Sequence, residues 1–254
     1  MIIDDAHVLM LLALADDELV IGHRHSHWTG FAPHLEEDLA FSSIAQDEIG
    51  HAVVWYGLAS ERTGKDPDQL GLGRPAGEYR HAVVCERPNG DWGYTVARQL
   101  LYDLAEDIRL DALSRSAWRE AAAATGALRR EERYHLLHAR AWLARLAEGP
   151  LQARERLVAG LREALPQAIG LFETLPGEQE LLADGTLPVA HAEQASHWID
   201  AVEAELAPFG LQGLVDRSLT PPARAGRHGL HSEEFIALCE EMTMLYRSEP
   251  GARW

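Results

Sequence analysis

Cysteine is scarce in this 254-residue sequence, and no uninterrupted apolar run is long enough to cross a membrane. The two cysteines, Cys85 and Cys239, lie far apart, which excludes a disulfide framework and a cysteine-based metal site. A reducing cytoplasm is therefore the expected location. The apolar run near the N-terminus is interrupted by Asp16, Asp17 and Glu18, so we expect neither a signal peptide nor a membrane span.

Basic residues are also in short supply. There are 23 lysines and arginines against 40 acidic residues, giving a net charge of −17, and Lys65 is the single lysine. Such a surface repels the phosphate backbone of nucleic acid, so a nucleic-acid partner is not expected. An anionic ligand needs a local cluster of basic residues or a contribution from a partner chain.

The alternating pattern of β-strands is almost absent, and "HAVVCE" near residue 83 is the one short candidate. Helical periodicity fills the rest of the chain, and 46% of the residues are hydrophobic. The pattern predicts four long helices at about 5–28, 34–63, 91–124 and from beyond Gly126 to 146. Shorter helices are expected at about 151–175, 189–207 and 231–248.

This order of elements favours an all-α fold, with an antiparallel four-helix bundle followed by additional C-terminal helices. We expect a single domain over residues 1–254, divided into a four-helix core at 1–148 and a helical extension at 149–254.

Each long helix can be drawn with an apolar seam that carries acidic or imidazole side chains near its middle. Buried carboxylates are costly unless they are paired or bind a cation, so four such seams meeting at one level predict a metal site. The candidate ligands are Glu18 in the first helix, Glu48 and His51 in the second, Asp103 in the third, and Glu132 and His135 in the fourth.

The spacing of these residues supports the prediction. Glu48 and His51 are three residues apart and share a helix face, and Glu132 and His135 repeat that spacing. One carboxylate from each of two helices, with Glu-x-x-His from the other two, is the ligand set of the ferritin-like dimetal carboxylate proteins. A third pair, Glu78 and His81, falls in a loop region and is interpreted as an ordinary surface pair.

Some assignments stay open at this stage. Glu106 and Asp107 are alternatives to Asp103, although Asp103 has the better spacing. Asp47 and Glu131 each precede a ligand. We expect Asp47 to hold the imidazole of His135 across the bundle, whereas Glu131 either holds that of His51 in the same way or faces solvent. Carboxylates with two imidazoles suit two iron ions, with manganese as the competitor, and an iron pair can activate dioxygen. Aromatic side chains are expected to wall an apolar pocket there: Trp28, Phe41, Trp55, Tyr102, Tyr134 and Trp142.

The motifs "QDEIGH" and "EERYH" resemble the two ligand motifs of the ferritin-like subunits of bacterial phenylacetyl-CoA epoxidase, the phenylacetate-degradation ring oxygenase. The resemblance is strongest to the PaaC-type subunit and spans nearly the whole chain. It also includes "WTGFAPHLEEDLA", "ERPNGDWGYTVARQLLYD", "EERYHLLHARAWLARL", "GRHGLHSEEF" and the terminal "PGARW".

The resemblance implies a complex that converts phenylacetyl-CoA to a ring 1,2-epoxide with dioxygen and with electrons from a reductase subunit. It implies a PaaA-type ferritin-like subunit as the catalytic partner, other epoxidase subunits, and a homodimer when the chain is isolated. PaaC-type subunits often lack several ligands, whereas this sequence keeps all six. It is therefore expected to contribute a di-iron site to the epoxidase. Contacts to CoA are expected to come partly from a partner, or from local arginines such as Arg24 and Arg98.

Two other interpretations stay open. In the first, the chain is a non-catalytic structural subunit with a vestigial metal site that stabilises the catalytic subunit. In the second, it is an iron-storing or peroxide-consuming ferritin-like protein that acts alone, against which the long C-terminal extension argues.

Overall fold

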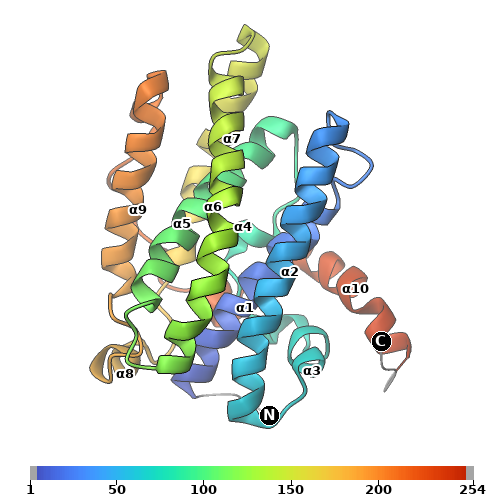
Figure 1. Cartoon of the computed structure of the whole chain (residues 1–254), viewed down its shortest axis with the longest axis vertical. Coiled ribbons are helices and arrows are strands. Elements are labelled where there is room, and N and C mark those ends of the chain that lie inside the picture. Colours follow the sequence, from blue (N-terminus) through green and yellow to red (C-terminus); the bar gives the residue numbers. More distant parts are fainter. Residues whose placement is uncertain (1–4, 250–254) are drawn as a thin grey trace. The chain divides into compact units, whose positions relative to one another are not determined.

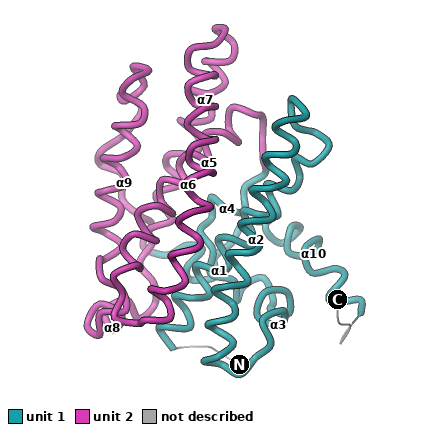
Figure 2. The backbone as a smooth tube through the Cα atoms, viewed as in Figure 1, with its two compact units in different colours: residues 1–88, 224–254 teal, residues 89–223 magenta. Residues whose placement is uncertain are grey.

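The computed structural model describes residues 5–249, and every regular element in that range is a helix (Figure 1). The predicted all-α, ferritin-like fold is thereby confirmed. The chain divides into two compact units, coloured separately in Figure 2. Unit 1 is Met1–Pro88 with Arg224–Trp254, and unit 2 is Asn89–Ala223.

Unit 1 is built around a pair of long helices, α1 (Ala6–Ser26) and α2 (Leu35–Thr63). α1 is buried along nearly its whole length, and within unit 1 it packs against α2 and against two short helices, α3 and α4. Asp5 begins α1 by accepting hydrogen bonds from the backbone N–H groups of His7 and Val8. The remaining elements are α3 (Pro67–Leu72), η1 (Ala76–Glu78), α4 (Val83–Glu86), η5 (Gly226–His228) and α10 (Glu233–Ser248).

Unit 2 contains the second pair of long helices, α5 (Trp92–Leu113) and α6 (Arg119–Ala147). α5 is the central helix, and it packs against α6, α7 and α9. Trp198 of α9 is fully buried and donates its indole N–H to the backbone oxygen of Leu101 at 2.9 Å. The other elements are α7 (Leu151–Ala168), η2 (Ile169–Phe172), α8 (Glu178–Ala183), α9 (His191–Leu206), η3 (Ala207–Phe209) and η4 (Gln212–Leu214).

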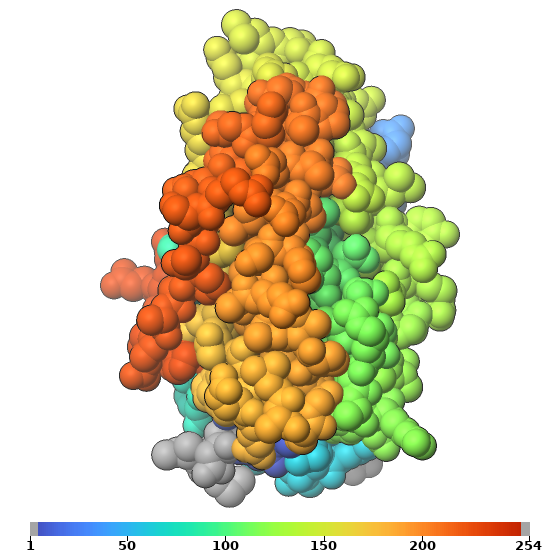
Figure 3. All heavy atoms as spheres, turned by 90° about the vertical axis from the view of Figure 1, so that its left-hand side faces the viewer, coloured from blue at the N-terminus to red at the C-terminus, as the bar shows by residue number. Residues whose placement is uncertain are grey.

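One face of unit 2 carries α9 and the turns that follow it. In Figure 3 this stretch runs from orange to red-orange, and η3 and η4 lie against α9. Arg217, just beyond η4, pairs with Asp200 and Glu203 on the exposed face of α9. The predicted helix at 189–207 is confirmed as α9 with only small changes at its ends.

Several predicted boundaries are wrong. The third long helix ends at Leu113 and not near 124, and Gly126 lies inside α6 instead of separating two helices. The actual break is held by tertiary hydrogen bonds within unit 2, from the Ser116 hydroxyl to the Thr186 oxygen and from the Ala117 N–H to the Gly185 oxygen. The stretch "HAVVCE" contains helix α4 and no strand. The first C-terminal helix ends as α7 at Ala168 and continues only as the short η2.

Between residues 5 and 249, no helix has the length and hydropathy of a transmembrane span. The expected division into a core at 1–148 and an extension at 149–254 stays a prediction. The two compact units follow a different partition, because the C-terminal helix α10 belongs with α1 and α2.

Candidate metal centre

Three consecutive acidic residues of α1, Asp16, Asp17 and Glu18, are all buried. Asp16 is neutralised from two sides. It accepts hydrogen bonds from the Tyr56 hydroxyl at 2.5 Å and from the Arg80 backbone N–H at 2.7 Å, and it forms a buried ion pair with Arg74. Burial would normally disfavour such a carboxylate, so the guanidinium and the two donors explain how it is tolerated.

Asp17 is compensated in the same way by a different arginine. Arg227 reaches it with two parallel N–H···O bonds, at 2.9 Å to Oδ1 and 2.7 Å to Oδ2. The backbone N–H of Ala82 donates to the same Oδ1 at 2.7 Å. Arg227 also donates to the backbone oxygens of Ala13 and Arg80, so the pair ties three segments of unit 1 together.

Glu18 differs from both neighbours. It is 1% exposed, and its Oε2 is buried with no hydrogen-bond partner among the described residues. The imidazole Nδ1 of His51 lies 3.8 Å from this oxygen, beyond hydrogen-bond distance. An uncompensated carboxylate oxygen beside an imidazole is an arrangement that a metal cation would stabilise.

Glu48 and His51 complete this half of the candidate site from α2. Both are buried, and the Nδ1 of His51 is 3.8 Å from the Oε2 of Glu48. Glu18, Glu48 and His51 each offer a ligand atom, and these atoms lie within 4.8 Å of one another. Gly22 lets α1 and α2 approach here, because a Cβ at this position would lie 3.1 Å from the Cβ of Glu48.

Unit 2 presents the second Glu-x-x-His pair on α6. Glu132 and His135 are 3% and 2% exposed, although their helix is otherwise strongly amphipathic, and the His135 Nδ1 lies 3.2 Å from the Glu132 Oε1. The predicted proximity of these two residues is therefore confirmed. Asp103 of α5 is fully buried in the same unit.

The two alternatives to Asp103 have other roles in the structure. Glu106 forms a buried ion pair with Arg109 one turn along the same helix. Asp107 is exposed on the surface of unit 2. A carboxylate paired with arginine, or turned to water, is a poorer metal ligand, and the choice of Asp103 stays a prediction.

The donor set matches the metal expected from the sequence. Carboxylate oxygens with imidazole nitrogens suit iron or manganese, and the Oε2 of Glu18 needs a positive charge that no described residue supplies by hydrogen bonding. The structure thus brings together Glu18, Glu48 and His51 within unit 1, and Glu132 and His135 within unit 2. Joining the two sets into one site stays a prediction.

The residues expected to hold the ligand imidazoles and to wall the pocket differ in burial. Asp47 is half-buried and Glu131 is exposed, so Asp47 is better placed to hold an imidazole inside the protein. Four of the aromatic residues are buried as expected: Phe41, Trp55, Tyr102 and Trp142. Tyr134 is 74% exposed, and its assignment to an interior wall is wrong.

The arginines suggested for CoA contacts are not on the surface. Arg24 is buried and donates to the backbone oxygen of Glu86 at 2.9 Å, and Arg98 is fully buried and donates to Asn89 at 2.5 Å. That suggestion is wrong, because hydrogen bonds inside each unit use both guanidinium groups.

Sequence reasoning also missed the compensating arginines and a second cluster. Arg74 and Arg227 neutralise the acids beside Glu18, and nothing in their spacing marks them. His81, assigned to the surface, is fully buried, and its partner is Glu86 and not Glu78. The motif "GRHGLHSEEF" contains both Arg227 and His231, and it was the one signal available.

Comparison with known proteins identifies the family of this chain. Residues 3–254 match the family described as "Phenylacetic acid catabolic protein". A relative from Escherichia coli (strain K12), one of the subunits of 1,2-phenylacetyl-CoA epoxidase, is 30% identical over 249 residues, which cover 96% of this chain and 97% of the relative. The resemblance expected from the motifs is therefore confirmed, and the chain belongs to the phenylacetic acid catabolic protein family.

Proposed function

We propose that this chain is a subunit of a multicomponent phenylacetyl-CoA 1,2-epoxidase of aerobic phenylacetate catabolism. The support is the similarity to the Escherichia coli epoxidase subunit along nearly the whole of both chains. The complex acts on phenylacetyl-CoA with dioxygen and with electrons from a reductase subunit, in the cytoplasm. A PaaA-type ferritin-like subunit is its principal partner.

The same proposal gives this chain its own pair of iron ions, with manganese as the competing metal. The ligands are Glu18, Glu48, His51, Asp103, Glu132 and His135. The observation that carries this step is the contrast within α1, where Asp16 and Asp17 are each compensated by an arginine and the Oε2 of Glu18 is not. Bound iron supplies dioxygen activation; the protein supplies a buried, oxygen-rich cage for it.

The surrounding residues have supporting roles in this proposal. Asp47 and Glu131 hold the ligand imidazoles in one tautomer and orientation. The buried side chains of Phe41, Trp55 and Tyr102 exclude water from the site, which protects a strong oxidant from side reactions.

The test is product formation by the reconstituted complex. Glu48→Ala removes a buried ligand from α2, and Glu61→Ala removes an exposed carboxylate from the same helix as a matched control. We expect Glu48→Ala to lose iron from this chain and to lower the yield of epoxide, with Glu61→Ala matching the wild type. An unchanged yield from a correctly assembled Glu48→Ala complex would sink the catalytic assignment and favour the structural-subunit alternative.

A further inference from the structure

A second cluster of polar side chains lies in unit 1 and has no part in the proposed metal centre. Its members are His81, Glu86 and His231, which we call the His–Glu–His cluster. The Oε2 of Glu86 lies 2.7 Å from the Nε2 of His81 and 2.9 Å from the Nδ1 of His231. The two imidazole rings are stacked, with centroids 4.1 Å apart and planes inclined by 16°.

The hydrogen-bond partners indicate where protons are favoured. The two ring nitrogens of His231 face two acceptors, the Glu86 carboxylate and the backbone oxygen of Tyr79 at 3.0 Å. An imidazole donates from both nitrogens only when it is protonated, so the two oxygen acceptors around His231 favour an imidazolium beside Glu86. The Nε2 of His81 faces Glu86, and its buried Nδ1 has no hydrogen-bond partner among the described residues, so a proton on Nδ1 would be buried without an acceptor.

Two imidazoles and a carboxylate also form a set that binds zinc, and the three ligand atoms lie within 4.8 Å of one another. The stacking argues against this. An imidazole nitrogen binds a metal through a lone pair in the plane of its ring, and two nearly parallel stacked rings cannot point these lone pairs at one ion. Hydrogen bonds to a shared carboxylate oxygen tolerate this stacked geometry better. We therefore interpret the cluster as a hydrogen-bonded group of ionisable side chains and not as a metal site.

The cluster fastens the beginning of α10 to unit 1. The other oxygen of Glu86 accepts the backbone N–H of Ser232, the N-cap residue of α10, at 2.7 Å. Phe235 in the first turn of α10 packs on both rings, with centroids 4.2 Å from His81 and 4.8 Å from His231. A Cβ at Gly226 would overlap the backbone oxygen of His81, so the incoming segment lies directly on the 79–86 loop.

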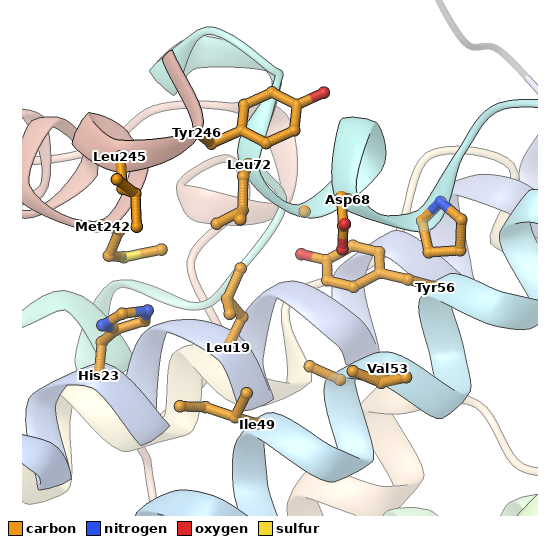
Figure 4. A pocket seen from close by; sticks show the side chains of 13 residues that line it. Leu19, His23, Ile49, Val53, Tyr56, Asp68, Leu72, Met242, Leu245 and Tyr246 are labelled. Carbon is orange, nitrogen blue, oxygen red and sulfur yellow. The ribbon is translucent and has the colours of Figure 1, made fainter. Parts of the chain in front are cut away.

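Further along, α10 forms one wall of an apolar groove of about 550 Å³ on unit 1. In Figure 4, Met242 and Leu245 project from α10 toward His23 and Leu19 of α1. The groove remains open to solvent, and Leu245 is 53% exposed. This part of α10 has further polar contacts, since Glu241 lies 3.0 Å from the Nε2 of His27 and Arg247 donates to the backbone oxygen of Arg74 at 3.3 Å. The His–Glu–His cluster is the buried polar attachment at the N-terminal end of the helix.

We propose that the His–Glu–His cluster is an acid-sensitive latch for α10, in which a proton taken up at Nδ1 of His81 separates the two stacked rings and releases the helix. In the closed state one carboxylate balances one imidazolium. Protonation of His81 adds a second positive charge, stacked on the first and next to the same single carboxylate. The two positive charges then repel each other.

The electrostatics of the closed state agree with this direction. Burial and the neighbouring His231 lower the pKa of His81 to about 4, against the favourable effect of Glu86. Burial opposes ionisation of Glu86, but hydrogen bonds from His231 and His81 hold the pKa of that carboxyl well below its ordinary value. Each element that packs against the cluster also carries charged residues. They are Asp16, Asp17 and Arg24 on α1, Arg80 and Arg87 on either side of α4, Arg227 on η5, and Glu234 on α10.

The direction of the pH effect on α10 follows from the difference in the pKa of His81 between the closed and the released state. The released state binds a proton at His81 near the ordinary value of 6.5, and the closed state resists it until about 4. The latch is therefore closed above about pH 6.5, and it loosens as the pH falls toward 4. If the whole difference in the pKa of His81 is coupled to release of α10, the equilibrium constant for release rises about 30-fold between pH 7.5 and pH 5.

Hydrogen exchange of the full chain tests the proposal. The amides of α10 are compared with those of α1 at pH 7.5 and pH 5, after correction for intrinsic rates. We expect α10 to lose about 30-fold in protection at pH 5 while α1 keeps its own. His81→Gln keeps a donor for Glu86 but cannot take up the proton, so it is expected to remove the pH dependence of α10. His34→Gln, at the exposed N-cap of α2, serves as the matched control and is expected to behave like the wild type.

Two results would overturn the latch. One is wild-type protection of α10 that does not change between the two pH values, or that changes only together with α1. The other is a His81→Gln chain in which α10 loosens in acid as it does in the wild type. The first comparison needs no variant, so a His81→Gln chain that fails to fold does not remove the test.

Discussion

Asp17 and Arg227, 210 positions apart in the sequence, form a two-point ion pair one residue before Glu18. Both are buried, at 0% and 2% exposed, and their shorter N···O distance is 2.7 Å. The pair joins the middle of α1 to the segment that leads into α10. It therefore fixes both the turn of α1 that presents Glu18 and the start of the C-terminal segment.

Breaking this pair from one side is expected to be costly. Arg227→Met leaves the Asp17 carboxylate buried without its cation, and we expect a loss of about 3–5 kcal/mol in the free energy of unfolding, measured by chemical denaturation. Arg217→Met is the matched control, because Arg217 pairs with Asp200 and Glu203 on the surface of unit 2. A loss no larger than that of the control would show that the buried pair is not important for stability.

The close contact of α1 with α2 gives a second prediction. Gly22→Val places a side chain where even a Cβ lies 3.0 Å from Ile49 and 3.1 Å from Glu48. We expect a loss of about 1–3 kcal/mol in stability from overpacking, together with weaker iron binding, because Glu48 is displaced. Gly50→Val introduces the same side chain into α2 with no atom within 4 Å of its Cβ, and it should change neither property. Equal effects of the two substitutions would contradict the role given to Gly22.

The choice among the acids of α5 can be tested by comparing iron content with stability. Asp103→Asn is expected to lower iron content, because Asp103 is the proposed ligand. Glu106→Gln is expected to keep the iron but to lower the melting temperature, since it leaves buried Arg109 without its carboxylate. Asp107→Asn, on the exposed side of the helix, should affect neither. Loss of iron in Glu106→Gln with full retention in Asp103→Asn would reverse the assignment.

A buried pair in unit 2 predicts a separate pH dependence. Burial opposes ionisation of Glu178, but hydrogen bonds from His191 and from the backbone N–H of Leu175 lower the pKa of this carboxyl. A carboxyl with a lowered pKa stabilises the fold above its ordinary value near 4.5 and loses that contribution as the pH falls through the folded pKa.

Glu178→Gln is therefore expected to lower the melting temperature at pH 7, with a difference from the wild type that shrinks as the pH falls below about 4.5. Glu180→Gln, on an exposed position of the same short helix, is the control. A difference for Glu178→Gln that stays constant from pH 7 to pH 4 would rule out a charged carboxylate at this position.

The sequence predicts those parts of the molecule that depend on local periodicity. The long helices α1 and α2 follow directly from apolar spacing, and the same spacing identifies Glu48, His51, Glu132 and His135 as buried polar residues. Gly126 was misleading, because a helix within a packed unit tolerates one glycine at a cost of about 1 kcal/mol. The real break at Ser114–Trp118 depends on hydrogen bonds to Thr186 and Gly185, which no local signal reveals.

The sequence does not predict which residues neutralise the buried carboxylates. The run Asp16, Asp17, Glu18 gives no sign that two of its carboxylates are neutralised and the third is not. That difference depends on Arg74 and Arg227, which reach α1 from 58 and 210 positions away. The burial of His81 has the same origin, because Glu86 of α4 and His231 of the C-terminal segment create its environment. The terminal motif "PGARW" lies outside the described residues.

We propose that this chain itself binds iron through Glu18, Glu48 and His51. Elemental analysis of the purified chain, expressed with iron and compared with His51→Ala and the surface control His34→Ala, tests it most directly. We predict two iron ions per wild-type and His34→Ala chain, and a clear loss in His51→Ala. A folded wild-type chain that holds no metal after reconstitution with ferrous iron, or a His51→Ala chain with the full complement, would contradict the account.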